Sequence, residues 1–165
     1  MYNVQFNAGR SREAIREAIA SLDDATPLYQ DIGEYMIEAT RQRFARGVAP
    51  DGTAWAPKKA STLERYKRLG YGSLTRPLIG PSKALSRQIQ SIVARDGVTI
   101  GSALIYSGVM QGGAPKGAFG TAKRGHPIPW GTIAAREWLG ISRDDETAIV
   151  AIADEYLGKT LDAEG

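Results

Sequence analysis

Few side chains in this sequence have the type and spacing that catalysis requires. His126 is the only histidine, and no carboxylate lies near it in the sequence, although a general base needs a partner to orient it. The chain has no cysteine, which excludes thiolate nucleophiles, thiolate metal sites and disulfides. A divalent-metal nuclease needs converging carboxylates, but residues 52–136 contain only Glu64 and Asp96 as acids.

One spacing is close to that of a phosphate-binding loop. Gly112 and Gly117 are separated correctly, but Ala118 and Phe119 occupy the positions where lysine and serine or threonine are required. The adjacent acids at positions 144 and 145 are explained by the start of a helix, whose dipole favours negative charge. We therefore predict no enzymatic activity, no metal site and no cofactor, and keep a hydrolase only as the alternative from a different class.

The chemistry that the sequence favours is binding through positive charge. Residues 52–136 have a net charge of +11, whereas residues 1–51 have −2 and residues 137–165 have −6. Such segregated charge steers and holds polyanions or acidic protein surfaces. The predicted partner is therefore either nucleic acid or another copy of this chain, whose acidic thirds would meet the basic middle head to tail.

The longest stretch without helical or strand periodicity is residues 111–130, called here the basic loop. It contains five glycines, three prolines and no acid. Loops of this length are uncommon in compact domains, and they are usually functional or disordered. The residues predicted to contact a partner are basic or aromatic and lie in this loop or shortly after position 57: Lys116, Phe119, Lys123, Arg124, His126, Trp130, Lys58, Lys59, Lys67 and Arg68.

The elements that must hold this loop begin with a predicted strand. Residues 1–8 alternate between apolar and polar side chains, as in a half-buried strand. Ser11 can cap a first helix that runs to Leu22, and Thr26-Pro27 predicts the start of a longer helix that ends at Gly47. A tight turn is predicted at residues 50–52, after which Trp55 is expected to pack back onto the long helix.

The middle of the chain predicts a short helix and a hairpin. Residues 61–64 form a capping box for the helix, whose basic side chains, Lys58 among them, are expected to face outward. Residues 71–81 predict an irregular connection. Alternating apolar residues on both sides of Asp96-Gly97 predict a hairpin, followed by a third strand over residues 103–110.

The C-terminal part predicts one more helix. Ser142 is placed to cap it, Gly158 is expected to end it, and residues 159–165 are expected to form a flexible tail. The start of the chain lacks the features of a signal peptide, and the longest apolar run, residues 148–153, is too short to cross a bilayer. We therefore expect no membrane association.

Together these elements predict a single α+β domain over residues 1–158. A small antiparallel sheet, made of the N-terminal strand, the hairpin and the third strand, is expected to pack against two long helices and a C-terminal helix, with the basic loop extending from it. Arg136 is expected to bond an acid or a carbonyl and so anchor the chain that returns from the loop. The predicted structural anchors are Trp55, Tyr106, Gln111, Arg136 and Trp138.

Several short motifs, taken together, resemble one known family. They are Phe44-x-x-Gly47, Pro50-Asp51-Gly52-x-x-Trp55-x-Pro57, Thr62, Leu85-x-x-x-Ile89, Val98-x-Ile100-Gly101, Tyr106-x-x-x-x-Gln111-x-Gly113 and Ala135-Arg136-x-Trp138-Leu139-Gly140-Ile141-Ser142. This pattern, over about residues 29–157, is similar to the phage virion morphogenesis family, which includes tail completion proteins. The chain departs from the family at Met110, Gly112 and Glu137, where a histidine, an aromatic residue and a proline are usual.

The resemblance implies a structural protein of tailed bacteriophages that acts late in assembly, where the tail meets the head. It implies a tail completion or tail terminator protein that forms a homo-oligomeric ring of about six copies around the DNA path. The implied partners are other copies of the chain, the tail tube, the head connector or neck proteins and the passing DNA. The implied location is the virion, and the host cytoplasm during assembly. A non-specific DNA-binding accessory protein of phage assembly is the alternative.

Overall fold

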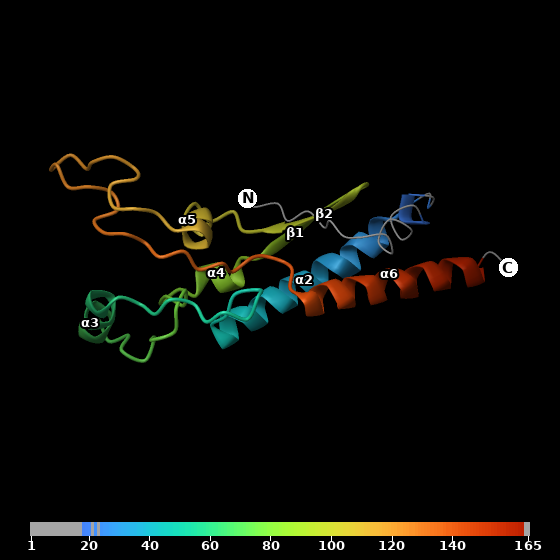
Figure 1. Cartoon of the computed structure of the whole chain (residues 1–165), viewed down its shortest axis with the longest axis horizontal. Coiled ribbons are helices and arrows are strands. Elements are labelled where there is room, and N and C mark those ends of the chain that lie inside the picture. The colour runs from blue at the N-terminus through green and yellow to red at the C-terminus, as the bar shows by residue number, and fades with distance from the viewer. Residues whose placement is uncertain (1–17, 21, 23, 164–165) are drawn as a thin grey trace.

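The computed structural model describes residues 18–20, 22 and 24–163 (Figure 1). The predicted strand at residues 1–8 and most of the predicted helix from Ser11 to Leu22 lie outside them, although residues 18–20 are helical. The described part is α+β, as the sequence predicts, and its sheet is a small antiparallel pair of strands.

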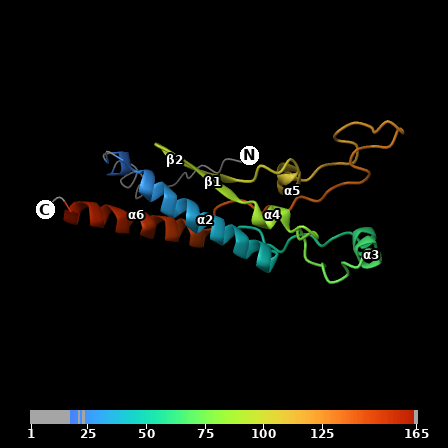
Figure 2. The same ribbon diagram turned by 180° about the vertical axis from the view of Figure 1, so that it is seen from behind.

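Two long helices and one hairpin make up the body. Helix α2 (Thr26–Arg46) lies beside helix α6 (Arg143–Ala163), and the two run in opposite directions (Figures 1 and 2). Strands β1 (Gln90–Ala94) and β2 (Gly97–Gly101) pack against α2. The described core contains Leu28, Ile32, Met36 and Phe44 of α2, Ile100 of β2, Ile149 and Ala153 of α6, Leu85 of the short helix α4 (Ala84–Arg87), and Ile89, Trp138 and Leu139 from the connections.

Helix α2 forms where the sequence predicts the longest helix. Proline lies in its first turn, where the missing N–H costs no hydrogen bond. Gly47 ends it in the left-handed conformation, with φ of 73°, and donates its N–H to the carbonyl of Arg43 at 2.7 Å. Gly33 lets the hairpin approach the helix, because a Cβ there would lie 3.0 Å from the Cβ of Ser91.

The hairpin is confirmed, but its turn is displaced by one residue. Gly97 pairs with Ala94 as the first residue of β2, so the two-residue loop is Arg95-Asp96 rather than Asp96-Gly97. The predicted irregular connection at residues 71–81 has no helix or strand, and the short helix α4 (Ala84–Arg87) follows it.

The predicted third strand over residues 103–110 is wrong. Residues 103–104 are irregular, residues 105–106 form a turn, and helix α5 (Ser107–Gly112) follows, so Gln111 and Gly112 belong to a helix and not to the basic loop. Local hydrogen bonds explain the difference: Ser102 Oγ accepts from the Leu104 N–H at 3.3 Å, and Ser107 Oγ donates to the Ser102 carbonyl at 3.2 Å. Such side-chain bonds compete with a strand ladder.

The predicted capping box is also wrong. Helix α3 (Ala60–Arg68) has Lys59 at its N-cap, with no side-chain cap bond. The helix starts earlier because the Lys59 carbonyl accepts from the N–H groups of Thr62 and Leu63, at 2.9 and 3.1 Å. Ser61 is thereby placed inside the first turn instead of at the cap.

Helix α6 starts as predicted and continues further than predicted. The Asp145 N–H donates to Ser142 Oγ at 3.1 Å, and Asp145 Oδ2 accepts from the Ser142 N–H at 2.7 Å, so each residue caps the other. The helix does not end at Gly158 but runs to Ala163. One glycine in a helix costs only about 1 kcal/mol, and an ion pair between Glu155 and Lys159 spans this position.

Candidate functional site

The basic loop is built as a narrow arm that projects from one end of the molecule (Figure 1). At its base, Ala114 and Ile133 exchange two backbone hydrogen bonds, at 3.0 and 2.7 Å. Further along, Phe119 donates its N–H to the Ile128 carbonyl at 2.8 Å. We call residues 113–133 the arm; its two legs are held to each other by backbone hydrogen bonds rather than by a hydrophobic core.

Two aromatic side chains and the arm's cations face solvent. Phe119 is 56% exposed and Trp130 is 76% exposed. The ring of His126 lies 5.3 Å from that of Trp130, at an angle of 44°. The predicted contact residues Lys116, Lys123, Arg124 and His126 are also exposed. The arm therefore offers positive charge beside aromatic surface, a combination that suits an anionic or amphipathic partner.

Helix α3 lies at the same end as the arm in both ribbon views (Figures 1 and 2). Its exposed Lys67 and Arg68 are predicted contact residues. Lys59 is exposed too, and its ammonium donates to the Thr132 carbonyl in the arm. We call this part of the molecule the basic end; its exposed cations are Lys59, Arg65, Lys67, Arg68, Lys116, Lys123 and Arg124.

Lys58 does not face outward as predicted. Its side chain is half-buried, and its ammonium donates to the Leu74 and Ile79 carbonyls, the latter at 2.6 Å. The same ammonium lies 4.5 Å from the centre of the Tyr66 ring. Burial lowers the pKa of Lys58, and the positive charge of Arg136 lowers it further. Lys58 thus holds the 71–81 connection in place and is less available to a partner than Lys59.

Three of the predicted anchors meet where the chain returns from the arm. Gln111 donates to the Leu139 carbonyl at 2.7 Å, and its side-chain oxygen accepts from the N–H groups of Trp138 and Leu139 at 2.9 and 3.0 Å. Arg136 donates to the carbonyls of Ala56 and Pro57 at 2.7 and 2.8 Å. These bonds join the returning chain to α5 and to the segment after α2.

The two buried tryptophans pack on the end of α2. Phe44 lies between them, with its ring centre 5.2 Å from that of Trp55 and 6.0 Å from that of Trp138. Trp55 also donates its indole N–H to the Glu137 carbonyl at 2.8 Å. Tyr106, by contrast, is 38% exposed and borders a cavity of about 580 Å³ between α3, α4 and α5.

Sequence reasoning missed a buried ion pair that links α2 to α6. Arg43 donates to Asp145 and, at 2.8 Å, to the Gly140 carbonyl, and its side chain is only 3% exposed. Tyr35 donates its hydroxyl to the same carboxylate at 3.2 Å. Burial lowers the pKa of Arg43, while the charge of Asp145 opposes that shift. The spacing along the helix could have indicated that Arg43 is buried, because Arg43 lies on the same helical row as Met36 and Thr40, which are buried.

The described residues contain no group of three or more histidine, cysteine or carboxylate side chains that could hold a metal ion. None of the described helices is long and apolar enough to cross a membrane. The candidate functional site is the basic end with its arm, because exposed cations and the exposed rings of Phe119 and Trp130 lie together there.

Comparison with known families gives a match over nearly the whole chain. A model of the phage virion morphogenesis family matches residues 7–158. No curated protein and no solved structure matches the chain. The motifs that resemble this family include Trp55, Gln111, Arg136 and Trp138, which the structure brings together at the base of the arm. The chain belongs to the phage virion morphogenesis family.

Proposed function

We propose that this protein completes the phage tail at its head-proximal end, as a non-enzymatic ring of about six copies around the DNA path. Membership of the phage virion morphogenesis family gives it a role in building phage particles. The position in the tail and the ring are our proposal, and they are supported by the distribution of charge over the molecule.

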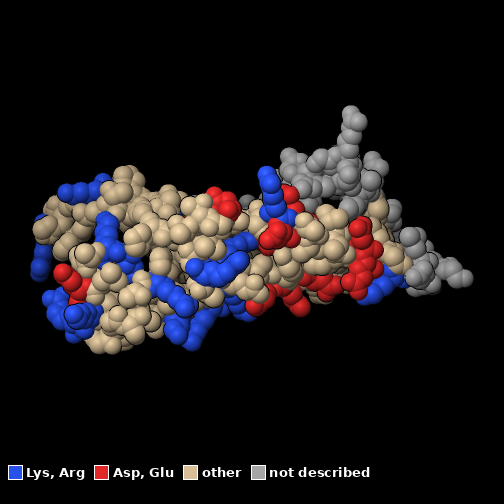
Figure 3. Space-filling view, turned by 60° about the horizontal axis from the view of Figure 1, so that its bottom comes forward, with Lys and Arg blue, Asp and Glu red and all other residues tan. Residues whose placement is uncertain are grey.

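The observation that carries the proposal is the separation of charge between the two ends. Blue cations gather over the end that holds α3 and the arm, and red acids gather over the part where α2 and α6 lie side by side (Figure 3). Exposed acids of that part are Asp31, Glu34 and Glu38 on α2 and Asp144, Asp154 and Glu155 on α6. A molecule with ends of opposite charge can associate head to tail, and such heterologous contacts close into a ring when the rotation between copies allows it.

The arm has the properties of a segment that contacts a further component of the particle. It reaches beyond the packed body, and it exposes both Phe119 and Trp130. Aromatic side chains on a projecting segment bury a large area when a partner covers them. We propose that the bodies of neighbouring copies form the ring and that the arm contacts the tail tube or the head connector.

The direct test is to locate the protein in particles and to remove it. In a phage that lacks this chain, we expect electron micrographs to show full heads and tails that fail to join. In complete particles, an antibody against the chain should label the head-proximal end of the tail. Normal particles without the chain, or label at another place, would contradict the proposal.

A second candidate function is non-specific DNA binding, favoured by the seven exposed cations of the basic end. Contacts of this kind weaken steeply with salt, because bound cations release counterions from the DNA. A filter-binding titration decides this point. Retention of duplex DNA that falls as salt rises supports a DNA contact, and no retention at low salt rules it out while leaving the ring proposal intact.

A further inference from the structure

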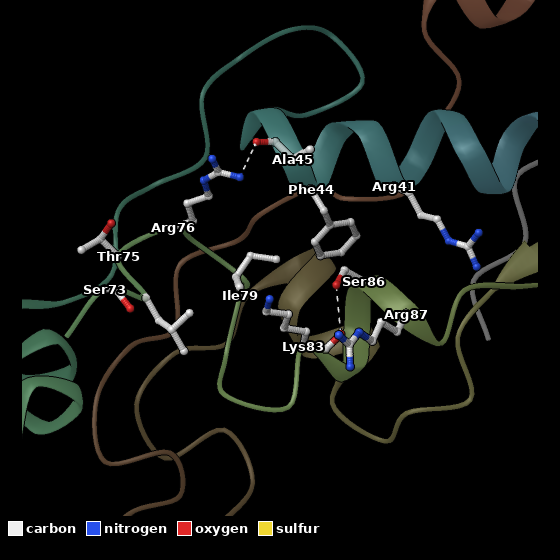
Figure 4. A pocket seen from close by; sticks show the side chains of 11 residues that line it. Arg41, Phe44, Ala45, Ser73, Thr75, Arg76, Ile79, Lys83, Ser86 and Arg87 are labelled. Carbon is white, nitrogen blue, oxygen red and sulfur yellow. Dashed lines mark hydrogen bonds between the residues drawn. The ribbon is translucent and has the colours of Figure 1, made fainter. Parts of the chain in front are cut away.

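A recess in the body carries positive charge that none of the predicted contacts accounts for. It has a volume of about 610 Å³ and lies between the C-terminal end of α2, residues 73–79 and α4. Figure 4 shows Arg41 and Phe44 projecting from α2, with Lys83, Ser86 and Arg87 facing them from α4 and the residue before it. We call this the cationic recess, after Arg41, Arg76, Lys83 and Arg87, which line it.

The charge of the recess is not balanced within the described part of the chain. No carboxylate lines it, and none of its four cations forms an ion pair among the described residues. Arg76 donates to the Ala45 carbonyl at 3.1 Å, which holds its guanidinium at the wall (Figure 4). Arg41, Lys83 and Arg87 are exposed at the rim. Four like charges around one recess repel one another, so an anionic occupant is favoured.

The rest of the lining favours one of two possible anionic occupants, an acidic protein helix, over the other, the phosphate backbone of a nucleic acid. The half-buried Leu74 and Ile79 contribute apolar surface to the walls. Phosphates of nucleic acid stay hydrated and gain little from such surface, whereas aspartate and glutamate side chains bring aliphatic groups together with a carboxylate. Carboxylates also form paired hydrogen bonds with guanidinium groups. The lining therefore suits an acidic protein surface.

An acidic surface of this kind lies on the same helix, nearer its N-terminus. Asp31, Glu34 and Glu38 are all exposed and follow one helical row that leads on to Arg41. We call them the acidic row. Each copy of the chain thus carries one acidic row and one cationic recess, which are distinct patches. Where the row of each copy meets the recess of the next copy, the contact is heterologous, and every copy in a closed ring uses both patches.

We propose that the cationic recess of one copy receives the acidic row of α2 from a second copy of this chain. This inference rests on the proposed function, because it names the contact through which the ring closes. The acids of one α2 then lie against the rim cations of the next copy, and the arm remains free for another component of the particle.

The test is a charge reversal on each side of the contact. One double variant, Lys83→Glu with Arg87→Glu, changes the recess, and another, Asp31→Lys with Glu34→Lys, changes the row. Sedimentation velocity at low ionic strength measures self-association, and circular dichroism checks the fold of each variant. We expect each variant alone to have an apparent Kd for self-association raised about tenfold or more.

A mixture of the two variants gives the sharper result. In an equimolar mixture the reversed row fits the reversed recess, and the two unchanged patches fit each other, so the mixture should associate more tightly than either variant alone. The control matched to the recess variant, Arg95→Glu with Arg143→Glu, makes the same change of charge as that variant at exposed positions outside both patches and should associate like the wild type.

Three results would overturn the inference. If both variants assemble like the wild type, the ring exists but uses another contact. If the recess variant assembles normally and loses only DNA retention, the recess is a nucleic-acid site. If the wild type itself stays monomeric, even with tail tubes present, the proposed ring fails and this contact fails with it.

Discussion

At the scale of single residues, two buried side chains join distant parts of the chain through polar bonds. Arg43 and Asp145 are 102 positions apart, and Trp55 and Glu137 are 82 apart. The sequence predicted Asp145 as part of a helix start and Trp55 as an anchor, because those roles depend on neighbours in the chain. It did not predict the ion pair, because no local pattern shows which distant carboxylate a buried arginine meets.

Replacing Arg43 with methionine should lower the free energy of unfolding by about 3 to 5 kcal/mol. Methionine leaves the buried Asp145 carboxylate without its cation, and that uncompensated charge is costly inside the protein. Chemical denaturation measures the loss. The control is Arg41→Met, an exposed position on the same helix, which should change stability by about 0.5 kcal/mol or less. Equal effects of the two variants would contradict this account of the core.

Replacing Gln111 with alanine should lower the free energy of unfolding by about 2 to 4 kcal/mol. Its amide bonds three backbone groups of Trp138 and Leu139, two of them N–H donors, and these would lose their partner. Thermal unfolding of Gln111→Ala measures this loss, and Gln88→Ala is the control, because Gln88 is an exposed glutamine. A melting temperature unchanged from that of the control variant would show that water replaces the amide without loss.

Among the elements, those with strong local signals were predictable. Helix α2 has a proline start, an apolar row and a glycine stop, and α6 has a capping pair at its start. The third strand was not predictable from alternation alone, because Ser102 and Ser107 turn the backbone through side-chain hydrogen bonds. The structure of the arm was also not predictable, because Ala114 pairs with Ile133 and the residues between them show no helical or strand periodicity.

The geometry at the base of the arm predicts an effect specific to one glycine. Gly113 has φ of 70° and ψ of 179°, a conformation that only glycine adopts readily, and a Cβ there would lie 2.7 Å from both the Ala135 nitrogen and the Ile133 carbonyl oxygen. Gly113→Ala should therefore destabilise the protein by about 3 kcal/mol or more.

The matched control for that prediction is Gly120→Ala, in the outer part of the arm. Gly120 also has a positive φ, of 85°, but a Cβ there would meet no atom within 4 Å. Gly120→Ala should therefore lower the free energy of unfolding by only about 1 to 2 kcal/mol, because alanine disfavours a positive φ. Denaturation curves for both variants make the comparison, and a Gly120 variant that is the less stable of the two would refute the close approach at the base.

At the scale of the whole molecule, the segregation of charge along the chain becomes a segregation in space. The sequence predicted it from three blocks of net charge. The fold produces it because α2 and α6 run in opposite directions and bring the acids of the first and last blocks side by side (Figures 1 and 3). The cationic recess was not predictable, since Arg41 belongs to the acidic first block and meets Lys83 and Arg87 only after folding.

Removing the outer arm should separate its role from that of the body. Replacing residues 115–132 with Asn-Gly, which favours a two-residue hairpin turn, keeps the Ala114–Ile133 pairing as the pair that closes the turn. No residue of the removed segment belongs to the described buried core, so the melting temperature should change by less than about 4 °C. Particles assembled with this variant should nevertheless fail to complete. A large fall in melting temperature would make the arm part of the folding core.

The most direct test of the central claim is the mass of the assembly that the full chain forms, measured by native mass spectrometry with and without purified tail tubes. Our account predicts one closed oligomer of about six copies that dissociates as salt rises, because opposite charges on neighbouring copies hold it. Monomers alone at every concentration, also in the presence of tail tubes, would contradict it.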